Sequence, residues 1–445
     1  MSDLRDRMTE TAERFAPTHD WLEGSLRRAR RRRRSRRFVS AVAVLLIFAL
    51  AFLGLSRVFA FHSSQAPAGA PACPRTWRQT PVAPAAGGLT AVSAVSATDA
   101  WAVGPNDDQS PGSATTIERW NGTGWTRVPS PNAAVGAGAV NELNGVAAIS
   151  ADDAWAVGDY GTRQPGTSLY PLRPLVEHWD GNRWSIVRVP DAYPLETMTS
   201  VAATGPDDVW AVGVGQPGQG DFVAIAEHWD GNAWSVADTP SLHDAGGGSA
   251  LHAVTALSPA DAWAVGGSGR TALAEHWDGS HWTRVDLPGQ DMTLAAVDAS
   301  SPDNVWAVGW GTNTSPGHLP PPVVERFDGT AWRMVDLTAP ASEYLLPSAV
   351  AVVSPRDVWI AGWMNTSTLS TKYGTDRALV AHWDGERARL VDIGIHGRPL
   401  NVAGAATSEG RVWLVGRAGG SFSGGQNDYM VGDRPFAWVG TCVAG

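Results

Sequence analysis

The residues of this sequence that are best suited to chemistry are glutamate–histidine pairs that recur along the chain. Glu177-His178, Glu227-His228 and Glu275-His276 combine a carboxylate with an imidazole, two of the ligands that zinc takes from proteins. Each pair is followed directly by Trp-Asp-Gly, so each belongs to a separate copy of one repeated unit. Groups held apart in separate copies cannot share one ion. We therefore interpret the pairs as structural, and we predict no metal site, no catalytic residues and no cofactor.

The repeated unit is clearest at residues 253–285, which read AVTALSPADAWAVGGSGRTALAEHWDGSHWTRV. A short apolar strand leads into the turn at 258–261, where Pro and Asp favour a reversal. A second strand at 262–266 alternates, so that Trp263 and Val265 share one face. A third strand at 272–277 and a fourth at 282–285 are joined by the tight Asp-Gly turn. Such a sheet is apolar on both faces and needs a copy of itself on either side.

The number of copies follows from the tryptophan of the second strand. It occurs at Trp101, Trp155, Trp210, Trp263, Trp306, Trp359 and Trp413. We therefore predict an all-β fold, a seven-bladed β-propeller of four-stranded blades spanning residues 73–445.

The fourth strand carries its own tryptophan in five copies. These are Trp125, Trp184, Trp234, Trp282 and Trp332. The sixth copy has Ala388 at this place, so we expect that blade to pack less well at its outer edge.

The seventh copy lacks an Asp-Gly turn and a fourth strand. The missing strand is found near the other end of the chain, because residues 77–81 (WRQTP) match residues 125–129 (WTRVP). We predict that this N-terminal strand closes the last blade and removes its open edge.

The two cysteines, Cys73 and Cys442, align with the place where the seventh copy lacks its turn. We expect a disulfide between them that replaces the covalent turn, and two unpaired buried thiols are the alternative. A disulfide requires an oxidising compartment.

The chain before the repeats is organised as a membrane anchor. Residues 1–37 contain twelve arginines against six acidic residues, residues 38–55 contain no charge, and the apolar character continues to residue 61. We predict a cytoplasmic basic segment at 1–37, a transmembrane helix at 38–61 and a linker at 62–72, with the propeller outside the cell membrane. Cleavage after Ala60 is an alternative that would release the propeller. Topology explains the arginines, so no nucleic-acid role is assigned to them.

The part of the chain beyond the anchor is acidic. Residues 1–57 account for +7, and subtracting this from the overall −10 leaves −17 for residues 58–445. This charge argues against nucleic acids and anionic membranes as ligands of the propeller. It suits a cationic or neutral partner of a propeller that we predict to be monomeric.

The unit resembles the kelch repeat of galactose-oxidase-like propellers and the Asp-box turn of sialidase-like propellers. The resemblance rests on the strand ending Val-Gly, the Glu-His-Trp-Asp-Gly segment and the following Trp, and it covers roughly residues 73–445. Only Gly266-Gly267 keeps the glycine pair of kelch repeats, and Asp boxes have one more residue between Asp and Gly. The match is therefore to a wider class of tryptophan-rich bacterial propellers, and it implies a fold rather than an activity.

The resemblance also defines what an enzyme of these families would need. A copper radical site like that of galactose oxidase needs a central cysteine, whereas both cysteines are assigned to the last blade. A sialidase-like hydrolase or lyase needs three converging arginines. Single arginines occur in suitable loops, at Arg163, Arg173, Arg377 and Arg434.

The two ends of the predicted ring differ in their loops. The uniform rim carries the short turns from first to second strand (Ser-Pro-x-Asp) and from third to fourth strand (Asp-Gly). The variable rim carries the long loops from second to third strand and the connections between blades, and binding surfaces are built in this way. Aromatic residues that could anchor a partner collect there: Tyr160, Tyr170, Phe222, Trp310, Trp363, Tyr373 and Tyr429.

These observations favour an extracellular binding module for a protein or a glycan. A sialidase-like enzyme at the channel mouth and a sensor that signals through residues 1–37 are the alternatives.

Overall fold

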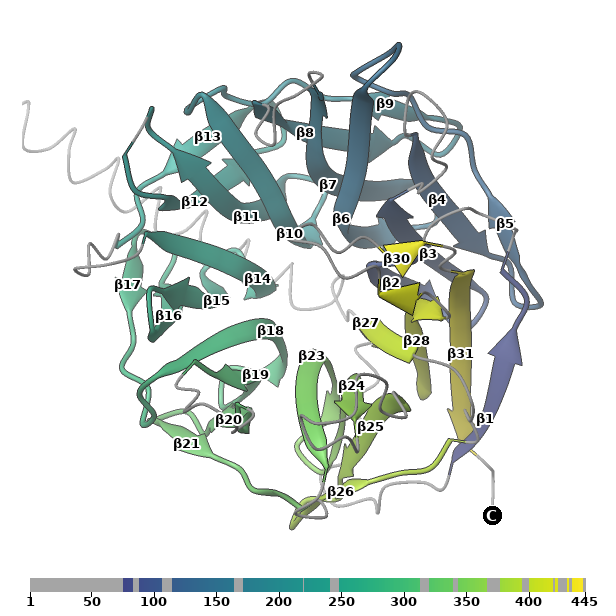
Figure 1. Cartoon of the computed structure of the whole chain (residues 1–445), viewed down its shortest axis with the longest axis vertical. Helices are drawn as coiled ribbons and strands as arrows, with labels where there is room; N and C mark the ends of the chain where they lie inside the picture. Colours follow the sequence, from purple (N-terminus) through teal and green to yellow (C-terminus); the bar gives the residue numbers. More distant parts are fainter. Residues whose placement is uncertain are drawn as a thin grey trace, which may run out of the picture. The chain divides into compact units, whose positions relative to one another are not determined.

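The computed structural model describes most of the repeat region of the chain. The described residues are 75–82, 88–105, 114–163, 171–218, 220–240, 248–312, 320–338, 343–365, 377–393, 400–418, 421–422, 430–431 and 434–442. They form seven antiparallel sheets arranged as blades around a central channel, so the predicted seven-bladed β-propeller is confirmed (Figure 1). The predicted segments 1–37, 38–61 and 62–72 lie outside the described residues. Within the described ranges, no helix has the length and apolarity needed to cross a membrane.

The first four blades each contain four consecutive strands. Blade 1 contains β2 (Ala91–Ser96), β3 (Asp99–Pro105), β4 (Thr115–Trp120) and β5 (Trp125–Arg127). Blade 2 contains β6 (Ala139–Ser150), β7 (Asp153–Thr162), β8 (Leu172–Trp179) and β9 (Trp184–Ile186). Blade 3 contains β10 (Leu195–Gly205), β11 (Asp208–Gln216), β12 (Val223–Trp229) and β13 (Trp234–Ala237). Blade 4 contains β14 (Ser249–Ser258), β15 (Asp261–Ser268), β16 (Thr271–Trp277) and β17 (Trp282–Arg284).

Blade 5 keeps this pattern, whereas blades 6 and 7 depart from it. Blade 5 contains β18 (Met292–Ser301), β19 (Asn304–Gly311), β20 (Pro322–Phe327) and β21 (Trp332–Met334). Blade 6 contains β22 (Leu337–Thr338), β23 (Tyr344–Ser354), β24 (Asp357–Asn365), β25 (Arg377–Trp383) and β26 (Ala388–Leu390). Blade 7 contains β27 (Leu400–Ser408), β28 (Arg411–Ala418), β31 (Arg434–Cys442) and β1 (Arg75–Thr80). The short strands β29 (Ser421–Phe422) and β30 (Met430–Val431) pair with each other.

The outer strand of blade 7 is β1, which pairs antiparallel with β31. Trp77 lies opposite Gly440, and its ring lies 5.0 Å from that of Trp359 in blade 6. On the other side, the Thr80 hydroxyl accepts a hydrogen bond of 3.0 Å from the indole of Trp125 in blade 1. The strand β1 therefore contacts the blades on both sides of blade 7.

Neighbouring blades are joined by edge-to-face tryptophan pairs. The second-strand tryptophan of one blade meets the fourth-strand tryptophan of the next, with ring centroids 5.0–5.4 Å apart, in the pairs Trp101–Trp184, Trp155–Trp234, Trp210–Trp282 and Trp263–Trp332. Such pairs are favourable beyond the area that they bury. Because both tryptophans recur in the repeat, the same contact is rebuilt between successive blades.

Blade 6 differs from the expectation of poor packing at its outer edge. Ala388 is fully buried there, and the two-residue strand β22 pairs parallel with β26, with Leu337 opposite Ala388. Leu337 packs in the same cluster as Trp306 of blade 5, whose side chain is also fully buried. An added strand thus covers the edge where the tryptophan is missing, and the expectation was wrong.

The glycine that ends the Trp-Ala-Val-Gly segment is required by a close approach of two strands. A Cβ atom added to any of five such glycines, or to Gly362, which follows Trp-Ile-Ala, would lie 2.0–2.1 Å from a backbone carbonyl oxygen. This oxygen belongs to the inner strand, except in blade 1, where it belongs to Gly88 just before β2. The glycines are Gly104, Gly158, Gly213, Gly266, Gly309 and Gly362. In five of these blades the inner strand has a β-bulge immediately after the contact. The repeated Val-Gly therefore reflects backbone packing rather than chemistry.

The bulges also supply a ring of links between blades. Side chains at or just before the bulged position donate to a carbonyl oxygen of the next inner strand over 2.7–2.9 Å: Thr90 to Leu143, Asn144 to Met198, Thr199 to Leu251, His252 to Leu294 and Ser348 to Val402. The other two blades have Ala295 and Ala403 at this position. We call these five hydrogen bonds the bulge links.

We predict that Gly266→Ala destabilises the protein by about 3 kcal/mol or more, because its Cβ would lie 2.0 Å from the Ala250 carbonyl oxygen. Gly124→Ala is the matched control, because a Cβ there meets no atom within 4 Å. Urea unfolding of both variants measures the difference. Equal stabilities would contradict the close-approach explanation.

Candidate binding rim and central channel

The repeated histidines are held by bonds within their own blades. The Nε2 atom of each lies 2.7–3.0 Å from the aspartate that opens the second strand, in the pairs His178–Asp153, His228–Asp208, His276–Asp261 and His382–Asp357. Each imidazole also lies 4.3–4.4 Å from the second-strand tryptophan of its blade. In the described part of the chain, no three His, Cys, Asp or Glu side chains form a group that could hold a metal ion. The histidines therefore have a structural role, as the repetition indicated.

The side chains of the uniform rim are also held by hydrogen bonds within their own blades. In the Asp-Gly turn of blade 2, Asp180 Oδ1 accepts the backbone N–H groups of Arg183 and Asn182, and these bonds lower the pKa of its carboxyl group. The indole of Trp179 donates to the Ala151 carbonyl oxygen in the adjacent turn. The same hydrogen bonds within the Asp-Gly turn recur in blades 3–6, so the residues of this rim have a structural role.

The glutamates of the repeat are buried in the blades. Glu177, Glu227, Glu275 and Glu325 are fully buried in the third strand of their blades. Burial raises the pKa of the first three carboxyl groups to about 8 and that of Glu325 to about 7. The neutral acid is therefore the form favoured inside the folded protein.

The variable rim contains four of the seven predicted aromatic anchors. Tyr160, Trp310 and Trp363 lie at the rim end of β7, β19 and β24, each partly exposed, and Phe222 precedes β12 with 43% exposure. The other three anchors, Tyr170, Tyr373 and Tyr429, lie outside the described residues.

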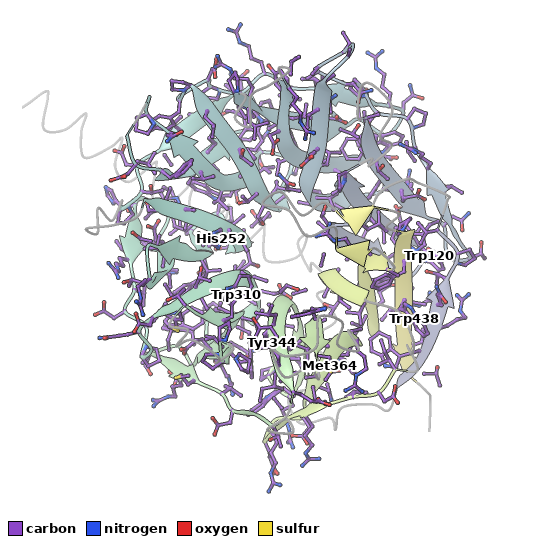
Figure 2. All side chains as sticks on the ribbon, in the orientation of Figure 1. Trp120, His252, Trp310, Tyr344, Met364 and Trp438 are labelled. Carbon is purple, nitrogen blue, oxygen red and sulfur yellow. The ribbon has the colours of Figure 1, made fainter. Side chains whose placement is uncertain are left out.

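Tyr344 is an aromatic residue of this rim that was not predicted from the sequence. Tyr344 begins β23, and its ring meets that of Trp363 edge-to-face at 5.4 Å. Beside this pair, Arg377 Nη2 lies 2.6 Å from Glu343 Oε1. Figure 2 labels His252, Trp310 and Tyr344, which come from the inner part of consecutive blades 4, 5 and 6. Tyr344 occurs in a single copy, so no repetition marked it in the sequence.

Two of the arginines considered for a sialidase-like site, Arg173 and Arg377, lie in separate ion pairs of different blades. Arg173 pairs with Asp191 at blade 2, whereas Arg377 pairs with Glu343 at blade 6. Arg163 follows β7 in blade 2, and the side chain of Arg434 is not among those described. Each paired arginine is neutralised locally instead of converging on a shared anion.

The central channel has a volume of about 360 Å³ and is lined by the inner strands of all seven blades. Its wall is made mainly of Ala, Val, Ser and Thr, and the ionisable side chains among its lining residues are His252 and Asp298. Asp298 accepts backbone N–H groups of Ala299 and Val352 over 2.9 and 2.7 Å. Enclosure by protein raises the pKa of its carboxyl group to about 6. Neither residue could be recognised in the sequence, because neither recurs in the other blades.

The predicted disulfide joins two side chains that lie outside the described ones. Cys73 lies outside the described residues, and Cys442 is described only through its backbone pairing with Arg75.

Comparison with known proteins identifies the fold. No family model matches the chain, and no curated protein matches it. Solved structures that it resembles include a streptogramin B lyase (TM-score 0.50, 11% identity, covering 82% of this chain and 97% of that one) and the U3-55K protein (0.50, 12%, 82% and 98%). YCF48 from Cyanidioschyzon merolae gives a TM-score of 0.49 at 14% identity, covering 81% and 98%. At these identities the likeness shows the fold alone. The chain is a seven-bladed β-propeller with tryptophan-rich blades.

We predict that the buried glutamates make the protein less stable at alkaline pH. A carboxyl group whose folded pKa is raised above its unfolded value loses stability as pH rises from about 4.5 through the folded pKa. Glu275→Gln should therefore gain about 1.4 kcal/mol or more over the parent protein at pH 9, because one pKa unit corresponds to that energy. Denaturant unfolding at pH 5 and pH 9 measures this, and an equal effect at both values would contradict the neutral-acid assignment.

Proposed function

We propose that this protein is a binding module that recognises a protein partner through its variable rim. The observation that carries the proposal is the contrast between the two rims. On the uniform rim the repeated polar side chains and indoles are bonded within their own blades. On the variable rim, partly exposed aromatic residues differ from blade to blade, as binding surfaces require. A glycan is the alternative ligand of the same surface.

The aromatic residues of blades 5 and 6 form the centre of the proposed surface. Trp310, Tyr344 and Trp363 combine apolar area with a polar atom, the composition found at the energetic centres of interfaces. The nearby cation Arg377 is paired with Glu343, so its charge is already balanced within the surface. This favours contact with an uncharged or basic part of the partner.

The strand β1 begins at the rim opposite the proposed surface. Arg75 lies opposite Cys442, and Thr441, the residue before Cys442 in β31, lies opposite Arg411 beside the turn at 409–410. The first residue of β1 therefore lies at the uniform rim.

We also propose that residues 38–61 anchor the protein in the cell membrane, with residues 1–37 in the cytoplasm and the propeller outside. The support is the uncharged segment 38–55 and the twelve arginines before it. An oxidising exterior would allow a disulfide between Cys73 and Cys442. The backbone pairing of Cys442 with Arg75, two residues after Cys73, supports that bond.

The binding proposal predicts that changing Trp310 and Trp363 to Ala weakens partner binding at least tenfold, about 1.4 kcal/mol, since aromatic anchors dominate interfaces. Residues 62–445, prepared oxidised, would be tested against an array of surface proteins and an array of glycans. Met334→Ala is the matched control, because this side chain is 58% exposed but lies on the outer strand β21.

Loss of protein binding in the double variant alone would support the proposal. Binding only to glycans would assign the rim to the alternative ligand, and equal binding by all variants would place the site elsewhere.

The anchor and the disulfide are tested together by the intact mass of the protein extracted from membranes without reductant. We expect the mass of the uncleaved chain, lighter than the reduced protein by two hydrogen atoms. Cys73→Ser is the control that removes the mass difference. A chain beginning after Ala60 would contradict the anchor, and free thiols in the folded protein would contradict the disulfide.

A further inference from the structure

The uniform rim departs from the repeat at one position of blade 5. In six blades a basic side chain lies opposite the second-strand tryptophan: Arg119, His178, His228, His276, Arg326 and His382. In five of these blades it bonds the aspartate that opens the second strand. In blade 5 that aspartate is replaced by Asn304. Arg326 is therefore the member of this series that lacks its carboxylate.

Arg326 has no substitute counter-ion. Asn304 is buried and bonded within blade 5, where its Oδ1 accepts the Trp306 indole over 3.0 Å. The carboxylate of the following turn, Asp328, is bonded to Arg333 and to its own turn. Within the residues that the structure describes, Arg326 forms no ion pair, and its buried Nε atom makes no hydrogen bond. A partly buried charge without a counter-ion is costly, although the Trp306 ring, 5.7 Å from Cζ, offsets part of this cost.

Blade 1 shows which group this position accepts. Arg119 Nε and Nη2 donate to the two carboxylate oxygens of Asp99, each over 2.9 Å. Paired N–H bonds to a carboxylate are among the strongest that a guanidinium makes. In blade 5 the Nε side of Arg326 is enclosed, whereas Nη1 and Nη2 are neither enclosed nor bonded. The donors that remain for a carboxylate therefore point outward from the blade.

The neighbouring blade changes the charge around this position in the same direction. Arg119 Nη2 also donates to the Ala151 carbonyl oxygen, over 2.8 Å, in the turn of blade 2 that contains Asp152. Hydrogen bonding to Asp99, with the charges of Asp99 and Asp152, raises the pKa of Arg119 above its usual value. Blade 6 has the exposed Arg356 at the place of Asp152. Of the two acids that accompany Arg119, one is thus replaced by an amide and the other by a cation.

The turns that contain Asp152 and Arg356 have the same geometry. In both, the third-strand tryptophan of the blade donates its indole N–H to the residue before, over 3.1 Å. In both, the side chain lies against the glycine of the Asp-Gly turn, because a Cβ atom at Gly181 or Gly385 would meet it first. Arg356 therefore occupies the place of Asp152 in space as well as in sequence.

The wider uniform rim is also less negative at blades 5 and 6. The turns of these two blades contain five arginines and five carboxylates, whereas those of blades 2–4 contain one arginine and eight carboxylates. The turns compared are residues 150–153, 178–185, 205–208, 228–235, 258–261, 276–283, 301–304, 326–333, 354–357 and 382–389. Charges farther than about 8 Å from a ligand are largely screened at physiological salt. The net negative charge of the chain therefore acts on a bound anion less than these arginines do.

We propose that Arg326 binds a carboxylate group on the uniform rim, at the junction of blades 5 and 6, through its outward Nη atoms. Arg356 adds positive charge on the neighbouring turn. The carboxylate belongs either to a free small organic acid or to an Asp or Glu side chain of a bound protein. The site lies on the opposite rim from Trp310 and Trp363, so it does not depend on the proposed partner surface.

The test uses acetate as the free acid and N-acetylglutamic acid methylamide, blocked at both backbone ends, as the side-chain probe. Acetamide and N-acetylglutamine methylamide are their uncharged counterparts. The full-length protein would be titrated with each probe by NMR, following the guanidinium of Arg326 and the indole of Trp306. We expect the charged probes to shift both signals saturably, the uncharged probes to leave them unchanged, and added salt to weaken binding.

Two variants test the missing carboxylate from opposite sides. Arg326→Gln removes the cation and should weaken binding about fivefold, the size expected of one exposed ion pair. Asn304→Asp keeps Arg326 but supplies the internal carboxylate that Asp99 gives to Arg119, and it should weaken binding at least as much. An aspartate can also keep the tryptophan bond of this position, as Asp357 does for the Trp359 indole over 2.8 Å.

Arg333→Gln is the matched control, because this arginine lies in the same blade and is already paired with Asp328. It should leave binding unchanged. Binding of acetate alone would support the proposal with a free acid as ligand, and binding of the glutamate probe would support it with a protein side chain. Equal affinity for charged and uncharged probes, full binding by Asn304→Asp, or an effect of Arg333→Gln equal to that of Arg326→Gln would overturn it. Should Arg326→Gln fail to fold, Asn304→Asp decides alone.

Discussion

The structure depends on the inability of any one blade to bury both of its faces. Each sheet has a second-strand tryptophan on a face that the next blade covers. In most blades the cover is an edge-to-face contact with that blade's outer tryptophan, and at blade 6 it includes Leu337 of the added strand β22. Every blade needs a neighbour to cover this face, and all blades have one only when the ring is complete. This explains why the second and the fourth strands of the repeat keep their tryptophans in most copies, whereas the loops vary.

Features that recur could be predicted from the sequence, because the same packing problem selects the same residue in every copy. The blade count, the Asp-Gly turns and the structural role of the histidines were of this kind. The glycine after Trp-Ala-Val was visible as a pattern, although its cause, a bulge that brings two backbones together, was not. Repetition therefore identified the repeated positions in the sequence, whereas the contacts that require those residues were seen only in the structure.

Features that occur once gave no comparable signal. Tyr344, His252 and Asp298 look like ordinary residues in the sequence, because nothing local distinguishes a channel wall from a rim. The strand β22 was also missed, since two residues are too few to form a pattern, and its parallel pairing is set by the edge that Ala388 leaves uncovered. Single-copy residues are also where a propeller departs from its scaffold, so the functional candidates are the residues least accessible to sequence reasoning.

The pairing of β1 with β31 has a consequence for the order in which the molecule is made. The first strand of the ring to be synthesised finds its partner only after almost the whole chain has followed. Until then β1 has an open edge, Trp77 has no neighbour in blade 6, and blades 1 to 6 can assemble only as an arc. The circle can therefore close only after residues 434–442 have been made.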